Sequence, residues 1–372
     1  MSNMKFRDLT NIDLYILSKE LQFLVGSRIR KVYQYSENEF KIKFSVPEKG
    51  SVDVAVLLPY TIHVTKQTKE SSEPTNFIMV LRKYLENKKI EKAAQWDLDR
   101  IFVFEFLEYK LIIEFFGKGN LILTDSNNKI ISSSRREETK ARTIKREEVY
   151  KFPESQRINP NEMPSDLYNL AMQEKEKEKL HLIAFLSKKI NFPPFYWEEI
   201  LFKTNAEPLL PLAKCTEKTF QSITKHTKDF MEELKNPNLI IYSDGTYSII
   251  PLKKNRGEIL EHPPTLSDLM DKFYLQMAEK EISSKTIEKV EKVQRKLQQQ
   301  KKYHGELLIK VDEMQKTGKT IVENERKMNL LIEEYKKMKK ENRKSEEIEK
   351  RLSDIFGSEI KIEKGKIIFE ID

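Results

Sequence analysis

At 372 residues the chain is too long for a single hydrophobic core, so we expect two to four folding units. Charged residues make up 34% of it and hydrophobic residues only 38%, which is low for one globule but normal when part of a chain is a solvent-exposed coiled coil. A single cysteine, Cys215, excludes a disulfide framework, and no apolar run reaches the length of a signal-peptide core or a membrane span, so we expect a cytosolic protein.

The net charge of +8 is distributed unevenly along the chain. Residues 271–345 hold 20 lysines and arginines against 13 aspartates and glutamates, a difference of seven. A basic segment of this kind suggests a polyanionic partner, and nucleic acid is the usual one. A solvated helix with a bias towards lysine would have the same composition, so charge alone leaves both interpretations open.

The first 160 residues predict an α+β domain. A helix over 10–25 begins at a cap formed by Thr10 or Asn11, and a second helix is expected at about 75–87. Segments rich in valine, isoleucine, phenylalanine and tyrosine predict strands at about 28–34, 38–46, 51–58 and 60–65. Four further strands are expected between 90 and 134, with turns at Asp99-Arg100, Glu108-Tyr109 and Ser126-Asn127-Asn128. Two groups of strands with intervening helices are typical of an α+β fold.

Residues 161–235 change character. They contain short helical patterns that are interrupted by prolines, and no glycine occurs between Gly119 and Gly245. The pattern predicts a small helical domain. Within 236–265, two short strands joined by Ser243-Asp244-Gly245-Thr246 predict a β-hairpin, and a linker follows it.

Residues 266–345 are typical of a coiled-coil arm. Apolar or aromatic residues recur at seven-residue spacing at Met314, Ile321, Met328 and Tyr335, and lysine and glutamate fill most other positions. The apolar stripe requires a partner, so we expect an antiparallel hairpin with its turn at Gly305 or Gly318. Within the last segment, 346–372, we expect a short helix over 346–356 and a closing hairpin of strands 359–363 and 366–371.

Two short motifs carry groups that strand stability does not require. One is Trp96-Asp97-Leu98-Asp99-Arg100, and the other is Phe116-Gly117-Lys118-Gly119-Asn120 with the strand after it. We expect them at opposite ends of the predicted meander, presenting a carboxylate, a guanidinium, an ammonium and open backbone amides. Such a set suits phosphate and ribose. The alternative is ordinary turn chemistry, because aspartate opens turns and glycine accepts positive φ.

These motifs resemble those of the NFACT family. The resemblance extends over Phe77–Leu85, over the first helix with Asp13, and over residues 135–153, which end in Tyr150-Lys151-Phe152-Pro153. It implies a β-rich NFACT-N head over 1–160 that is similar to the N-terminal fold of formamidopyrimidine-type DNA glycosylases, a helix-hairpin-helix domain over 161–235, and a coiled coil. Longer relatives carry a further C-terminal NFACT-R domain, which we expect to be absent here.

The chain departs from the family pattern in the helical domain. Asn191-Phe192-Pro193-Pro194 stands where a glycine-containing hairpin is expected, so we predict a packing or spacer role there and no direct grip on phosphate.

The resemblance also implies a set of tRNA-binding residues. They are Asp13, Asp99, Arg100, Lys118, Asn120 and Arg142. An acid in a first helical turn can instead stabilise the helix dipole, and Arg142 is one of six cations within 135–146, which could be an ordinary solvated loop.

We expect no catalytic role and no cofactor or metal. Gly318-Lys319-Thr320 imitates the end of a P-loop, but Glu313 stands where the first glycine is needed. The five histidines are scattered and none pairs with Cys215 at metal-ligand spacing. The chain begins Met1-Ser2-Asn3 and cannot supply the N-terminal proline nucleophile of the glycosylases.

The function that the resemblance implies is ribosome-associated quality control. Such factors recognise a large ribosomal subunit that is blocked by stalled peptidyl-tRNA, and they hold a tRNA so that the nascent chain gains an untemplated C-terminal tail. The partners would be tRNA and ribosomal RNA, with no membrane and no small-molecule substrate. The alternative is an RNA-binding scaffold on split large subunits without tailing activity. A DNA-repair-like protein or a surface adhesin is a weaker third possibility.

Overall fold

The structure is a computed structural model of the chain. It describes residues 7–69, 73–139, 142–174, 178–254, 257–363 and 365–369, and for residues 277–291 it describes the backbone alone. The chain divides into two compact units, residues 1–279 and 280–372. Both motifs and all six predicted tRNA-binding residues belong to the first unit, whereas Met1, Ser2 and Asn3 lie outside the described residues.

The first sheet is a four-stranded antiparallel meander in the order β1-β2-β3-β4. Its strands are β1 (Arg28–Ser36), β2 (Glu39–Val46), β3 (Gly50–Leu57) and β4 (Thr61–Thr65). These bounds confirm the four strands that the β-branched and aromatic runs predict.

Helix α1 (Asn11–Glu20) begins where the sequence predicts, at Thr10. The Thr10 hydroxyl accepts from the backbone N–H of Asp13, and the Asp13 carboxylate accepts from the backbone N–H of Thr10, which forms a capping box. A 3-10 turn, η1 (Gln22–Leu24), follows the helix, and α2 (Asn76–Leu85) confirms the second predicted helix.

The second sheet is also an antiparallel meander, in the order β5-β6-β7-β8-β9. Its strands are β5 (Lys92–Gln95), β6 (Ile101–Glu105), β7 (Tyr109–Glu114), β8 (Asn120–Asp125) and β9 (Ile130–Ser133). The sequence predicts four strands here, and the structure has five because residues 115–119 form a turn that separates β7 from β8. A small hairpin of β10 (Glu137–Glu138) and β11 (Thr143–Ile144) comes next.

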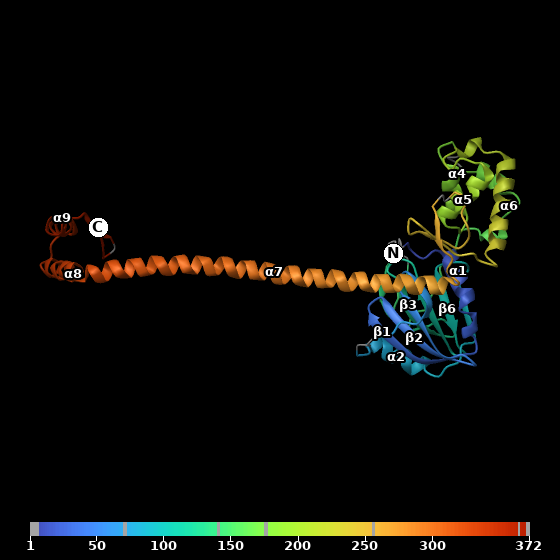
Figure 1. Ribbon diagram of the computed structural model, residues 1–372, viewed down its shortest axis with the longest axis horizontal. Coiled ribbons are helices and arrows are strands. Elements are labelled where there is room, and N and C mark those ends of the chain that lie inside the picture. Colours follow the sequence, from blue (N-terminus) through green and yellow to red (C-terminus); the bar gives the residue numbers. More distant parts are fainter. Residues whose placement is uncertain are drawn as a thin grey trace. The chain divides into compact units, whose positions relative to one another are not determined.

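The middle of the chain is helical, as expected. Its elements are η2 (Pro160–Glu162), α3 (Leu167–Met172), α4 (Leu182–Lys189), α5 (Pro194–Thr204), η3 (Leu212–Lys214) and α6 (Glu217–Glu233). Figure 1 shows α4, α5 and α6 gathered apart from the strands of the two sheets. A three-stranded sheet follows, in which β12 (Ile240–Tyr242) pairs with β13 (Tyr247–Ser248) and β14 (Ile259–Glu261). The hairpin is confirmed, and β14 lies within the segment that the sequence predicts as a linker.

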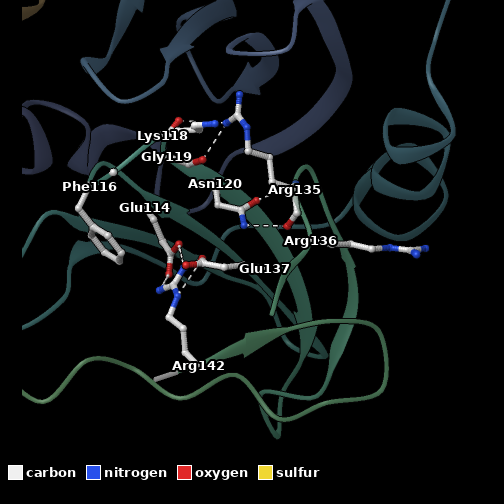
Figure 2. A pocket seen from close by; sticks show the side chains of 10 residues that line it. Glu114, Phe116, Lys118, Gly119, Asn120, Arg135, Arg136, Glu137 and Arg142 are labelled. Atoms are coloured by element: carbon white, nitrogen blue, oxygen red, sulfur yellow. Dashed lines mark hydrogen bonds and ion pairs between the residues drawn. The ribbon is translucent and has the colours of Figure 1, made fainter. Parts of the chain in front are cut away.

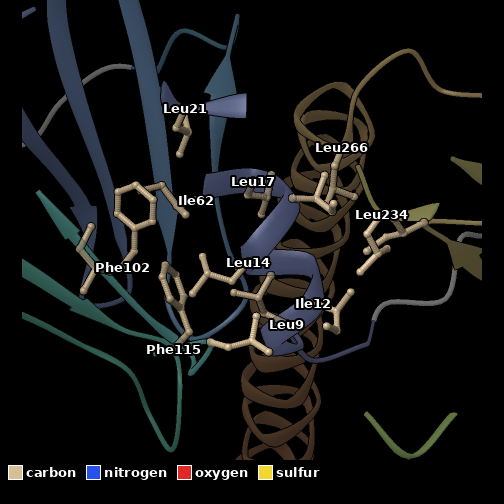
Figure 3. Packing of buried hydrophobic residues seen from close by; sticks show 14 of the residues in the cluster. Leu9, Ile12, Leu14, Leu17, Leu21, Ile62, Phe102, Phe115, Leu234 and Leu266 are labelled. Carbon is tan, nitrogen blue, oxygen red and sulfur yellow. The ribbon is translucent and has the colours of Figure 1, made fainter. Parts of the chain in front are cut away.

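One hydrophobic core joins these parts of the first unit. It contains residues from α1, both large sheets, the helical domain and the first turns of α7. Figure 3 shows α1 and its neighbours, with Leu14 and Leu17 on α1 and Leu266 at the start of α7 among the buried side chains. Glu20, at the end of α1, accepts hydrogen bonds from the backbone N–H groups of Leu266 (2.7 Å) and Ser267 (2.9 Å). A carboxylate at this position stabilises α7, because its negative charge lies at the positive end of the helix dipole.

The predicted antiparallel turn is wrong at both glycines. Helix α7 (Leu266–Glu323) is continuous for 58 residues and passes through Gly305 and Gly318. The apolar stripe in its second half is exposed to solvent, including Met314 (75% exposed) and Ile321 (47%). A glycine inside a helix costs only about 1 kcal/mol relative to alanine, which is too little to end a long helix.

The second unit contains the last elements of the chain. They are α8 (Glu325–Lys340), α9 (Ser345–Phe356), β15 (Ile360–Glu363) and β16 (Lys366–Phe369), with β15 and β16 paired as an antiparallel hairpin. A small core is formed by Leu331, Met338, Ile348, Leu352 and Ile360. The short helix and the hairpin confirm the predictions, although residues 370 and 371 of the predicted last strand lie outside the described residues.

Among the described residues, no helix combines the length and the apolar character that crossing a membrane requires.

Candidate nucleic-acid interface

Both motifs lie at the same end of the second sheet. In an antiparallel meander, alternate loops share an end, and this end is formed by the β5–β6 loop (Trp96–Arg100), the β7–β8 turn (Phe115–Gly119) and the residues after β9 (Ser134–Arg136). A hydrogen bond from the backbone N–H of Phe115 to the carbonyl of Arg100 (2.8 Å) joins the first two directly. The expectation that the two motifs lie at opposite ends of the meander is therefore wrong. The turn between β7 and β8 reverses the chain once more than predicted and places the second motif beside the first. We call this end the loop end.

The β5–β6 loop is a tight turn with two residues in the left-handed region. Asp97 has φ 42° and Leu98 has φ 49°. The turn closes through hydrogen bonds from the backbone N–H of Trp96 to the carbonyl of Ile101 (2.9 Å) and from the N–H of Asp99 to the carbonyl of Trp96 (2.7 Å). Side chains from elsewhere hold it: Asn191 donates to the carbonyl of Leu98 (3.0 Å), and Gln95 donates to the carbonyl of Asp99 (2.8 Å).

Asp99 and Arg100 have different roles within this loop. One Asp99 carboxylate oxygen accepts from the backbone N–H of Arg100 (2.7 Å), which is the turn chemistry of an aspartate. The Arg100 side chain is half-buried, and no described residue pairs with its guanidinium. The structure therefore leaves the positive charge of Arg100 uncompensated, while Asp99 is engaged by its own loop.

The β7–β8 turn requires both of its glycines. Gly117 has φ 59° and Gly119 has φ 70°, which confirms the turn chemistry. A Cβ at Gly119 would lie 2.8 Å from the Leu58 Cβ, whereas one at Gly117 would meet nothing within 4 Å. Gly119 is thus the point where the turn lies directly against the first sheet.

Replacing Gly119 with alanine should lower the free energy of unfolding by about 2–4 kcal/mol, because left-handed strain and overpacking add. The matched change Gly117→Ala introduces left-handed backbone strain without overpacking, and it should cost about 1 kcal/mol. Urea unfolding of the two variants measures the difference. Equal losses would contradict the close approach of the turn to Leu58.

Two adjoining cavities flank the β7–β8 turn. The smaller has a volume of about 350 Å³ and the larger about 740 Å³, and both are lined by Gly117, Lys118, Arg135 and Arg136. Figure 2 shows the smaller one, with Arg135 bent back towards the turn and Arg136 directed away from it. The larger cavity reaches the first sheet at Glu37, Asn38, Pro59 and Tyr60. It has three cations in its lining against one carboxylate, that of Glu37.

Arg135 fixes the turn to the first sheet without losing its charge. Its guanidinium donates to the carbonyls of Lys118 (3.0 Å) and Gly119 (2.8 Å), to the Glu37 carbonyl (3.4 Å) and to the Asn38 side-chain oxygen. All four acceptors are neutral. The guanidinium therefore remains a source of positive potential beside the exposed ammonium of Lys118.

Asn120 positions Arg135 and is not itself available. It is 4% exposed, its amide donates to the Arg135 carbonyl (2.9 Å), and its oxygen accepts from the Ser134 hydroxyl (2.9 Å) and from the Arg135 N–H (3.0 Å). The structure therefore gives the predicted tRNA contact Asn120 a positioning role: its buried side chain orients Arg135.

Arg142 is held in a carboxylate network beneath the smaller cavity. It forms a bidentate pair with Glu114 (2.9 and 2.8 Å) and a second pair with Glu137 (3.0 and 2.6 Å), as Figure 2 shows. Burial opposes the charged form, but these carboxylates outweigh it and raise the pKa of Arg142 above its ordinary value. Two carboxylates around one guanidinium leave no net positive charge for a phosphate. Among the described cations of 135–146, Arg135 and Arg136 line both cavities without a described carboxylate partner, whereas Arg142 is neutralised.

Asp13 is buried rather than displayed. It is 0% exposed, it pairs with Arg7 (2.5 and 2.8 Å), and it accepts from the Thr10 hydroxyl (2.7 Å). The Arg7 guanidinium lies over the rings of Phe195 and Tyr247. Burial opposes its charge, yet the Coulombic attraction of Asp13 raises the pKa of Arg7. In this arrangement Asp13 joins the start of α1 to the helical domain, and it has the structural role in the first helical turn that the sequence leaves open.

Comparison with known proteins identifies the family of this chain. A family model described as the NFACT N-terminal and middle domains matches residues 10–365. The chain belongs to the NFACT family. Residues of this NFACT chain are 26% identical over 321 positions to the archaeal Rqc2 homolog aRqcH of Methanocaldococcus jannaschii, covering 80% of this chain and 48% of that protein. They are 34% identical over 130 positions to ribosome quality control complex subunit 2 of Saccharomyces cerevisiae, covering 33% of this chain and 12% of that protein.

Solved structures share the NFACT fold. The crystal structure of the fibrinogen binding protein from Staphylococcus aureus superposes with a TM-score of 0.58 at 22% identity, covering 71% of this chain and 98% of that one. This confirms the α+β class with a β-rich NFACT-N head. The likeness to the glycosylases stays a prediction. The NFACT chain spans about half the length of its archaeal relative.

Proposed function

We propose that this NFACT chain is a ribosome quality control factor that binds tRNA and the obstructed large ribosomal subunit and promotes untemplated C-terminal tailing of stalled nascent chains. The observation that carries the proposal is the loop end, where Arg100, Lys118, Arg135 and Arg136 have no described carboxylate partner. Uncompensated cations beside a cavity suit the phosphates of folded RNA. The names of the yeast and archaeal relatives support the ribosomal context.

The proposed division of labour separates recognition from adhesion. Arg100 forks onto an RNA phosphate or base edge, and Lys118 with Arg136 adds phosphate contacts around the β7–β8 turn. The excess of seven positive charges in residues 271–345 provides sequence-independent affinity for ribosomal RNA, which falls with salt. We propose that the ribosome performs the peptide chemistry and that this chain positions its partners.

The alternative remains an RNA-binding scaffold on split large subunits without tailing activity. Both candidates use the basic segment for ribosomal RNA, and only the tailing factor needs a tRNA at the loop end. The RNA that copurifies with the protein therefore separates them.

Sequencing that RNA from cells that express the tagged full chain is the test. We expect enrichment of one or two tRNA species together with large-subunit RNA. Arg100→Ala should abolish tRNA recovery, because it removes the proposed contact with RNA. Its guanidinium has no described structural partner, so the fold should be kept and large-subunit RNA should still be recovered. Ribosomal RNA alone from the wild type would favour the scaffold, and recovery of neither RNA would reject both functions. Unchanged tRNA recovery by Arg100→Ala would reject the site.

A further inference from the structure

An exposed stacked aromatic pair stands beside Arg100. Trp96 and Phe152 lie face to face, with ring centroids 3.8 Å apart and ring planes inclined by 19°. Trp96 is 39% exposed although it packs against Phe152. Neither the turn chemistry of the loop nor the cation pattern of the loop end requires an indole at this position.

The pair is rigidly supported from below. Tyr150 meets Phe152 edge to face at a centroid distance of 4.9 Å, and its hydroxyl donates to the Glu114 carboxylate (2.7 Å) that also holds Arg142. On the other side, the left-handed Leu98 is 7% exposed and turns into the core, which leaves Trp96 and Asp97 outside. A rigid aromatic surface loses little conformational entropy when a ligand stacks on it.

A third cavity opens at this pair. Its volume is about 570 Å³, and it is lined by Trp96, Asp97, Phe152, Pro153 and Glu154. The volume falls within the range of about 300–1,000 Å³ that is typical of small-ligand sites. The lining combines aromatic faces with two carboxylates and no cation. A phosphate would be repelled there, whereas a flat group with N–H donors along its edge would be matched on both counts.

We propose that the Trp96–Phe152 pair and the carboxylates of Asp97 and Glu154 form a stacking site for one unpaired nucleobase that carries an exocyclic amino group. The inference rests on the proposed RNA-binding function and deepens it. The base stacks on the aromatic faces, its amino edge donates to the carboxylates, and its phosphate reaches Arg100, four residues along the chain from Trp96. Cytosine, adenine and guanine fit this description, and uracil does not.

A basic peptide is the competing occupant, because arginine also stacks on aromatic rings and pairs with carboxylates. The surroundings favour RNA. Arg100 is the last residue of the same loop, and Lys118, Arg135 and Arg136 lie at the same end of the sheet. These cations attract a polyanion and repel a basic segment.

Tryptophan fluorescence of the full chain tests the site without a mutation. The chain has two tryptophans, and Trp197 is 0% exposed, so a ligand that stacks on the surface affects Trp96 alone. Titration with a ten-residue oligocytidylate should quench the emission and protect it from acrylamide. Polyphosphate, which has charge but no bases, should do neither. Trp96→Phe should lose the response to oligocytidylate.

Affinity measurements by anisotropy complete the test. Trp96→Ala should bind oligocytidylate about 5- to 150-fold more weakly, the usual loss for one stacked base, and Trp96→Tyr should lose less. The wild type should prefer oligocytidylate over oligouridylate, and Asp97→Asn with Glu154→Gln should remove that preference. Asparagine tolerates the left-handed backbone at position 97, so this change is conservative.

Three outcomes would overturn the stacking site. Binding of tRNA with unchanged Trp96 emission rejects it and leaves the proposed function standing. Quenching by nona-arginine but not by oligocytidylate assigns the site to a basic peptide instead. Failure of the wild type to bind any RNA rejects the stacking site and the proposed function together.

Discussion

Replacing Asp13 with asparagine should lower the free energy of unfolding by about 2–4 kcal/mol. The change leaves the Arg7 guanidinium without its carboxylate and removes one half of the capping box of α1. Breaking a buried ion pair costs about 3–5 kcal/mol, and we reduce this figure because the Arg7 side chain is 26% exposed. Urea unfolding followed by circular dichroism measures the loss.

Two control variants separate the contributions. Asp8→Asn removes the same charge from an exposed position near α1 and should have an effect below about 0.5 kcal/mol. Thr10→Ala removes the hydroxyl half of the capping box but keeps the pair of Arg7 with Asp13, and it should cost about 1 kcal/mol. A variant Asp13→Asn that unfolds like the wild type but binds tRNA more weakly would contradict the structural role and assign Asp13 to the RNA surface.

Local patterns predict most of the secondary structure of this chain. The four strands of the first sheet follow runs of β-branched and aromatic residues, and α1 begins at a threonine with an acid three residues later. The fifth strand of the second sheet is harder to predict, because residues 109–125 resemble one long apolar run. Gly117 and Gly119, both at positive φ, are the signal that marks the turn within it.

The prediction of a turn at Gly305 or Gly318 fails for a different reason. A seven-residue repeat says that a helix has an apolar stripe, but it says nothing about which chain covers that stripe. A single glycine inside a helix costs about 1 kcal/mol and does not compel a turn. In α7, Gly305 and Gly318 are ordinary helical residues, and the stripe that includes Met314 faces solvent.

The candidate site is predictable by residue type but not by pairing. Sequence identifies six cations within 135–146, yet one of the two carboxylates that compensate Arg142 is Glu114, which lies 28 residues earlier on β7. The pairing depends on the register that brings the end of β7 beside the β10–β11 hairpin. Asp13 is a similar case, because its partner Arg7 packs on rings from two other parts of the chain.

The loop end should carry most of the affinity of the first unit for tRNA. We expect the triple variant Arg100→Ala, Lys118→Ala and Arg136→Ala to bind tRNA at least about 100-fold more weakly at ~150 mM salt, since hydrogen bonds to charged groups contribute about 1.5–3 kcal/mol each. The slope of log affinity against log salt should fall by about two to three, close to one for each phosphate that the variant no longer binds. None of the three side chains has a described structural partner, so unfolding midpoints should stay unchanged.

A matched control removes three cations from the opposite end of the same sheet. Lys88 pairs with Glu108, Lys92 with Glu105 and Lys129 with Glu147, all away from the loop end. Replacing these three lysines with alanine lowers the net charge by the same amount and should change tRNA affinity less than about threefold, because their charges are already compensated and remote. Equal losses of tRNA affinity in the two triple variants would mean that affinity follows net charge, and they would reject the loop end as the interface. A loss confined to the first variant, with its lower salt slope, would identify Arg100 and the β7–β8 turn as the surface on which tRNA phosphates are bound.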